Sequence, residues 1–281
     1  LVAQRLEKAG VHVVYGIVGL KTHCKVAQVV RREYDSLRSY VHIGTGNYHS
    51  GTSRLYTDLG LFTSNPEISE DVVHLFHYLT GRSLFQQYKK LVIAPIALKK
   101  KFLSLIQNET ENAKKGLPSR IIAKMNSLEE KDICQALYEA SRQGVKIDLI
   151  VRGVCSLRPG VPGMSENIRV ISIIGRFLEH SRIFYFRNGA KHPLDGSFYM
   201  GSADWMYRNL AARVEAVVPI ENKLLRDRLW EILNVHLEDQ RQAWDMLPSG
   251  DYVQRRVPAD PNVAGSHQKL MSLTLQRDSH A

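Results

Sequence analysis

The chain has 281 residues, 44% of them hydrophobic and 23% charged, and this ordinary globular composition excludes a mostly disordered protein. Its 38 Lys and Arg residues against 28 Asp and Glu give a net charge of +10, which favours a polyanionic partner, although a solvated basic surface would need none. The three cysteines share no CxxC spacing, so we expect neither a zinc module nor a disulfide framework, and a reducing, cytoplasmic compartment is favoured.

Signals for targeting and for macromolecular partners are few. The longest apolar runs are like residues 91–98, far short of the roughly twenty residues that span a bilayer, so we expect no transmembrane segment, while peripheral membrane association stays open. No zinc finger, RNP-type strand motif or basic zipper is present, which disfavours sequence-specific binding of nucleic acid. The chain begins without Met inside a helix-like pattern and has no signal peptide, so we take it as part of a longer protein.

The first part of the chain alternates strand and helix patterns. A helix over residues 1–8 is expected to end at Gly10, where glycine commonly closes a helix. Valine-rich and alternating segments predict strands, and a turn at residues 64–66 precedes a second amphipathic pattern. The expected elements are strands at 11–18, 25–31, 40–43 and 60–63, and a helix at 71–79.

The remainder repeats this alternation, which predicts an α/β fold. Ser127 and Glu130 have the spacing of a capping box that opens a helix, and Gly144 is expected to end it. The other expected elements are strands at 91–96, 120–125 and 145–151 and a helix at 98–115. From residue 259 the chain is polar and without periodicity. We therefore predict domains at 1–89 and 90–258, followed by a flexible tail at 259–281.

An internal repeat is the most informative feature of the sequence. A histidine precedes a Gly-Thr or Gly-Ser turn by 21 residues in both halves, at residues 23 and 44 and at residues 180 and 201. One offset of 157 residues maps every member of the motif: His23 onto His180, Lys25 onto Arg182, Gly44 onto Gly201, Asn47 onto Asp204, and Asp58 onto Glu215. Duplication explains these matches, so we predict two related domains with the active site in the cleft between them.

Each copy of the motif suits phosphoryl chemistry. Residues two apart on a strand point to one face, so His23 lies beside Lys25, and His180 beside Arg182. The imidazole supplies a nucleophile, while cations such as Arg182 and turn donors such as Asn47 would bind phosphate oxygens. A single copy would more simply be a satisfied strand histidine beside a tight turn; two copies at equal spacing favour the catalytic interpretation.

The paired motif resembles the phospholipase D superfamily, whose signature is His-x-Lys, an Asp five residues after the Lys, and a later Gly-Ser/Gly-x-Asn. Here the Asp position holds Val30 in one copy and Arg187 in the other, and the second copy has Arg182 in place of Lys. These departures disfavour a hydrolase that relies on that Asp.

The sequence around the motifs resembles a narrower family, the bacterial polyphosphate kinases, and matches the C-terminal half of these enzymes. Polyphosphate kinases make inorganic polyphosphate from ATP. The resemblance covers the chain to about residue 258 and rests on six segments in the same order. These are Gly19-Leu-Lys-Thr-His-Cys-Lys25, His42-Ile-Gly-Thr-Gly-Asn47, Arg54-Leu-Tyr-Thr-Asp58, Val151-Arg-Gly-Val-Cys-Ser156, Leu178-Glu-His-Ser-Arg182 and Gly201-Ser-Ala-Asp-Trp-Met206.

The resemblance implies roles for individual residues. In that family the histidine matched by His23 is transiently phosphorylated, and the residues matched by Tyr56, Arg152 and His180 contact the nucleotide. His42 matches a histidine associated with activity. The resemblance also implies ATP or ADP and polyphosphate as substrates, a homo-oligomer, and Mg²⁺ whose ligands lie upstream of this segment. We therefore expect no metal ligand in this chain, which could be inactive by itself.

The two copies differ, and the differences predict which histidine is the nucleophile and which is the proton donor. Lys25 would hold His23 neutral as the nucleophile, whereas a carboxylate at Asp204 would favour the imidazolium form of His180 as a proton donor. Two alternatives to a polyphosphate kinase stay open from the sequence: a phospholipase D-like phosphodiesterase or nuclease, and a non-enzymatic fragment that binds polyanions.

Overall fold

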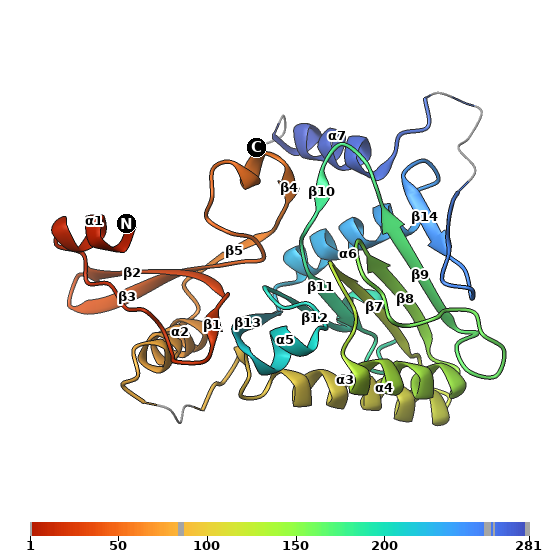
Figure 1. The fold of residues 1–281 in the computed structure, drawn as a ribbon, viewed down its shortest axis with the longest axis horizontal. Helices are drawn as coiled ribbons and strands as arrows, with labels where there is room; N and C mark the ends of the chain where they lie inside the picture. The colour runs from red at the N-terminus through yellow and green to blue at the C-terminus, as the bar shows by residue number, and fades with distance from the viewer. Residues whose placement is uncertain (1, 84–86, 256–259, 261, 279–281) are drawn as a thin grey trace.

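The computed structural model describes residues 2–83, 87–255, 260 and 262–278, and its centre is a large mixed sheet (Figure 1). The sheet is ten-stranded, and β7, β8 and β9 run parallel while most other pairs are antiparallel. Its strands follow the order β1 (Lys21–Thr22), β13 (Arg213–Ile220), β12 (Ser197–Gly201), β11 (Ile183–Phe186), β7 (Arg120–Met125), β8 (Lys146–Val151), β9 (Ile168–Ile173), β14 (Ala243–Met246) and β15 (Tyr252–Gln254), with β6 (Val92–Ala94) paired to β13.

Helices cover both faces of this sheet, so its strands are apolar on both sides. Figure 1 shows α3 (Leu98–Lys114) and α4 (Lys131–Arg142) on one face and α6 (Lys223–Leu237) on the other. In β11 all four side chains are buried: Phe184 and Phe186 belong to the cluster with α3 and α4, and Ile183 and Tyr185 to the cluster with α6. This alternation is what a sheet between two helical layers requires.

The first part of the chain forms a smaller unit beside the large sheet. It consists of α1 (Val2–Lys8), an antiparallel sheet of β2 (Lys25–Glu33), β3 (Ser36–Gly44) and β5 (Gly60–Thr63), and α2 (Pro66–Leu79). Its core is continuous with that of the large sheet, because Ile43 and Val72 share one buried cluster with Val214 and Leu233. The two halves are therefore packed as one body.

Two short parallel pairs join the halves at the site. β1 of the first half adds to β13 of the second, with Thr22 opposite Val214. β4 (Tyr56–Thr57) pairs with β10 (Leu178–Glu179), with Thr57 opposite Glu179. Each pair ends immediately before a histidine or a carboxylate of the repeated motif, so the chain pairing brings the two copies together.

Most predicted elements are present, with ends shifted by a few residues, and the α/β class is confirmed. The strand predicted at 11–18 is wrong: this segment is irregular, and Val11, Val14, Tyr15 and Val18 are exposed. Valines favour strands only where a neighbouring strand and a packing surface exist, and the described residues offer neither here.

Two further predictions need correction. Helix α4 begins at Lys131 with Glu130 as its N-cap, not at Ser127, because Leu128 bridges to Cys155 and Trp205 and so keeps this segment extended. The predicted flexible tail at 259–281 contains helix α7 (Ser266–Asp278), although residues 259, 261 and 279–281 lie outside the described residues. The weak amphipathic pattern of α7 gave no signal for a helix.

Candidate active site

The first motif histidine is held by a carboxylate from the other copy. His23 follows β1 and its Nδ1 lies 2.8 and 2.9 Å from the two carboxylate oxygens of Glu215 in β13. Glu215 is fully buried, and the hydroxyl of Ser202 donates to it at 2.5 Å. Since a carboxylate can only accept, Nδ1 of His23 carries the ring proton and Nε2 carries the lone pair.

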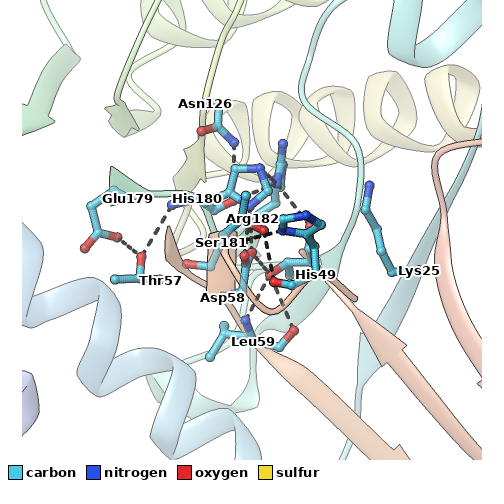
Figure 2. A network of polar contacts seen from close by, with 12 residues as sticks. Lys25, His49, Thr57, Asp58, Leu59, Asn126, Glu179, His180, Ser181 and Arg182 are labelled. Carbon is cyan, nitrogen blue, oxygen red and sulfur yellow. Dashed lines mark hydrogen bonds and ion pairs between the residues drawn. The ribbon is translucent and has the colours of Figure 1, made fainter. Parts of the chain in front are cut away.

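The second motif histidine has the reciprocal arrangement, shown in Figure 2. His180 follows β10, and its Nδ1 lies 2.8 Å from Oδ1 of Asp58, which belongs to the first copy. The hydroxyl of Thr45 donates to the same carboxylate at 2.7 Å. Thr45 and Ser202 are themselves equivalent positions of the repeat. Each copy therefore supplies a hydroxyl and an acid that orient the histidine of the other copy.

The two motif cations are placed differently. Lys25 is 5% exposed, and its Nζ donates to the backbone oxygen of His23. Burial lowers the pKa of Lys25 to about 8, while the nearby Glu215 opposes that shift. The ammonium group is therefore close to losing its charge at mildly alkaline pH.

Arg182 is fully engaged within the protein. Its Nε and Nη2 donate to Asp204 at 3.2 and 3.0 Å, and Nη1 donates to the backbone oxygens of Thr45 and His180. The same Nη1 lies 3.1 Å from Nε2 of His180. In the described structure Arg182 thus joins both motif turns, and its predicted contact with phosphate stays a prediction.

The prediction that Asp204 makes His180 the protonated partner of the two histidines is wrong. Asp204 does not contact His180, since its carboxylate is used by Arg182 and by the backbone N–H of Asn126, and the acid beside His180 is Asp58. Burial lowers the pKa of His180 and the adjacent Arg182 adds to that shift, while Asp58 and, more weakly, the charge of Asp204 oppose it. The geometry therefore favours a neutral His180, not the imidazolium predicted from the sequence.

The residues predicted to contact nucleotide lie around His180. The Tyr56 ring packs against the His180 ring, with centroids 4.9 Å apart. Arg152 follows β8, and its Nε donates to Oδ1 of Asn126 at 3.0 Å, while Nδ2 of Asn126 donates to the backbone oxygen of His180. Asn126 was not singled out from the sequence; its position after a buried strand was the available signal.

The two remaining predicted residues, His42 and Asn47, line a hollow of about 280 Å³ that also includes Tyr56 and Asp58. Nδ1 of His42 lies 2.7 Å from the hydroxyl of Tyr48, and burial lowers the pKa of His42. Asn47 is exposed in this hollow. The first half alone lines this hollow, and Tyr56 and Asp58 connect it to His180 of the second half.

A protein-bound metal does not fit the described residues. No group of three or more His, Cys, Asp or Glu side chains among residues 2–83, 87–255, 260 and 262–278 is arranged to hold an ion. The acids near the histidines are already used by Nδ1 atoms and hydroxyls. The described residues therefore offer no cluster suited to holding Mg²⁺.

Fold and site together define a duplicated α/β protein whose two histidine–carboxylate pairs are exchanged between the copies. The family model described as "Polyphosphate kinase C-terminal domain 2" matches residues 91–266, and "Polyphosphate kinase C-terminal domain 1" matches residues 1–84. The chain therefore belongs to the polyphosphate kinase family, and the resemblance seen in the six motif segments is confirmed.

Individual relatives agree with the family models. A polyphosphate kinase of Synechocystis is 55% identical over 96% of this chain, and one of Dictyostelium discoideum is 48% identical over 98%. The crystal structure of polyphosphate kinase from Porphyromonas gingivalis superposes with a TM-score of 0.91 at 33% identity, covering 99% of this chain and 42% of that one. The chain spans 36% of the Synechocystis protein and 25% of the Dictyostelium protein. Among the described helices, none combines the length and the apolar character that a membrane span needs.

Proposed function

We propose that the chain carries the phosphohistidine centre of a polyphosphate kinase, which transfers the terminal phosphate of ATP reversibly to inorganic polyphosphate. The observation that carries this proposal is the fixed tautomer of His23: Glu215 holds the proton on Nδ1 and leaves Nε2 with its lone pair. The His23 side chain is 20% exposed, so this nitrogen belongs to a residue that a substrate can reach.

The first half-reaction forms one bond and breaks another. The lone pair of His23 Nε2 attacks the terminal phosphorus of ATP, an N–P bond forms, and the bond to the bridging oxygen breaks to release ADP. As the ring becomes positively charged, the buried carboxylate of Glu215 stabilises it through the Nδ1–H bond. In the second half-reaction a terminal oxygen of polyphosphate attacks the same phosphorus, and the N–P bond breaks.

The phosphohistidine also suits a reversible reaction. An N–P bond to imidazole is close in energy to a phosphoanhydride, whereas a serine ester would be too stable to pass the phosphate on in both directions. Lys25 adds a cation beside His23, which offsets negative charge on the phosphoryl oxygens while it stays protonated. The net charge of +10 suits a polyanionic substrate.

The nucleotide part of the proposal concerns the other histidine. Tyr56 packs against the ring of His180, and Arg152 is connected to the backbone of His180 through Asn126; they are proposed to supply a ring face and a guanidinium for ATP or ADP. Asn47 and His42 line the adjoining hollow and are proposed to contact phosphate groups. We extend the proposal to a cytoplasmic homo-oligomer that uses Mg²⁺ held outside the described residues.

Labelling with [γ-³²P]ATP tests the proposal on the complete gene product that contains this chain. The expected result is an acid-labile, base-stable label that disappears in His23→Ala and persists, formed more slowly, in His180→Ala. Mass spectrometry would locate the phosphoryl group. A label that survives His23→Ala rules out the assignment.

Two other functions are separated from this proposal by further assays. A phosphodiesterase would cleave a bis-ester phosphate without nucleotide. This function is disfavoured because Val30 and Arg187 occupy the positions of the signature Asp. A non-enzymatic polyanion module would bind polyphosphate after loss of both His23 and His180 and would show no transfer.

A further inference from the structure

A second buried polar cluster lies directly behind His180. Glu179, the residue before His180, is 4% exposed and points to the opposite side of β10. Its carboxylate is 2.8 Å from Nζ of Lys124, 2.9 Å from the Thr57 hydroxyl and 2.7 Å from Nε2 of His267. His236 of α6 also contacts this carboxylate, with Nε2 3.3 Å from Oε1. Burial alone would raise the pKa of Glu179, but the Lys124 ammonium and the contacts with His236 and His267 hold that pKa well below its usual range.

This carboxylate fixes the strand pairing that aligns the site. β4 and β10 pair over only two residues, and such a short ladder does not set its own register firmly. The bond from Thr57 to Glu179 adds a side-chain link across the pair, as Figure 2 shows. Asp58 and His180 directly follow these two strands, so their contact at 2.8 Å depends on this register.

The cluster is completed by the C-terminal helix. His267, in the first turn of α7, is 3% exposed, and its Nδ1 accepts from the backbone N–H of Phe177. Nε2 must therefore carry the proton that it donates to Glu179. The turn is anchored by Asp239, which accepts from the backbone N–H of Ser266, and by Gln242, which accepts from that of His267.

The rest of α7 is less closely packed against the site. A cavity of about 450 Å³ lies between α6, α7 and the Thr57–Leu59 segment. Its walls are mainly apolar, and they include Ile232 of α6 and Leu270 and Met271 of α7. This space separates much of the helix from the strands, so the contacts of His267 with Glu179 and with the backbone N–H of Phe177 link α7 directly to the segment that carries His180.

We propose that Glu179 and His267 are positioning residues, through which helix α7 holds β10 in register and so aligns His180 with Asp58. The inference rests on the proposed function for its kinetic consequence, and on geometry alone for its structural one. It assigns to the C-terminal helix a role in the site that no motif of the sequence indicated.

The test compares three variants of α7. His267→Leu removes the donor to Glu179, His267→Gln places an amide N–H near the position of Nε2, and Arg277→Ala is the matched control because it removes an α7 contact to Glu231 on α6 instead. Circular dichroism of each variant shows whether α7 and the fold persist. The ring of His180 is then titrated by NMR in the 281-residue chain, with its signal assigned by His180→Gln.

We expect a lower pKa of His180 in His267→Leu, because the Asp58 contact raises that pKa and the variant loosens it. His267→Gln and Arg277→Ala should retain the wild-type value. In the complete gene product, His267→Leu should lower kcat about tenfold or more with KM for ATP nearly unchanged, since a misalignment of about 1 Å is enough for such losses.

The outcomes separate the two proposals. An unchanged His180 pKa in a folded His267→Leu variant overturns the positioning role, as does a loss of kcat that His267→Gln fails to rescue. If His267→Leu does not fold, His267→Gln carries the test alone, and a shifted His180 titration in this variant with its α7 intact would overturn the donor assignment. Absence of phosphate transfer in the wild type would refute the proposed function while leaving the NMR result to decide the alignment.

Discussion

Replacing Glu215 by Gln tests the tautomer on which the proposed chemistry depends. The carboxylate accepts from two donors, Nδ1–H of His23 and the hydroxyl of Ser202. Both donors reach Oε2 of Glu215, and Nδ1 also lies 2.8 Å from Oε1. A glutamine replaces one of these two oxygens by an NH₂ group, which can only donate, so an NH₂ group lies beside Nδ1 in either orientation. An NH₂ group beside Nδ1 favours the tautomer of His23 that carries its proton on Nε2, where the proton blocks attack on phosphorus.

The structure sets the size of the effect. An orientation that keeps the proton on Nδ1 leaves one buried donor without an acceptor: the NH₂ group where it faces Nδ1–H, or the Ser202 hydroxyl where the NH₂ group takes the place of Oε2. A buried donor without a partner costs about 1–3 kcal/mol. Since each 1.4 kcal/mol is about tenfold, the competent tautomer of His23 should be depleted roughly 5- to 150-fold, and phosphorylation of His23 should slow by the same factor.

The assay is single-turnover labelling by [γ-³²P]ATP in the complete gene product. Glu221→Gln is the matched control, because Glu221 follows the same strand but its side chain is 51% exposed and pairs with Lys90. The Glu215 charge also raises the pKa of Lys25, so Glu215→Gln should move the alkaline loss of rate below the value near pH 8 expected for the wild type. A single-turnover rate within twofold of wild type would refute the reasoning.

Three further perturbations follow from the same geometry. Asp58→Asn should lower the pKa of His180, because the Asp58 contact raises it, and NMR titration of the ring would contradict this if the pKa rose. Lys25→Arg should move the alkaline limb of the kcat profile upward from near pH 8, since arginine keeps its charge; a limb that stays in place would exclude Lys25 as its origin. A Cβ at Gly46 would lie 1.9 Å from Oδ2 of Asp58, so Gly46→Ala should displace that carboxylate and reduce transfer about tenfold without loss of helix content. A phosphate-transfer assay measures the loss of activity and circular dichroism measures the helix content of Gly46→Ala. Full activity would show that the site tolerates displacement of the Asp58 carboxylate.

Much of the fold was predictable because its elements are strongly patterned. Mainly apolar runs such as 120–125 and 145–151 are almost entirely buried, and short runs of this composition are typical of strands inside a sheet covered on both faces. The failures share a physical cause. The segment at 11–18 has strand propensity without a described partner strand, and α7 has little amphipathic pattern because one buried histidine, rather than an apolar stripe, fastens its first turn.

The members of the site were predictable, but their partners were not. A constant offset identified the histidines, cations and acids, since duplication preserves spacing along the chain. It carries no information on whether an acid serves its own copy or the other. That choice is made by the pairs β1–β13 and β4–β10, whose strands are two residues long on one side or both and leave almost no sequence signal.

The exchange of acids explains why the two copies act as one site. Neither copy can orient its own histidine, so His23 and His180 are both correctly held only when the halves are docked. The exchange is also unequal: Glu215, which holds His23, is fully buried, whereas the side chain of Asp58, which holds His180, is 26% exposed. A sealed acid keeps one orientation because no water competes for its oxygens, and this suits a nucleophile that must present the same nitrogen in both half-reactions. A partly exposed acid leaves its histidine more freedom to adjust, so the difference in burial supports the proposed assignment of the phosphate to His23 rather than to His180.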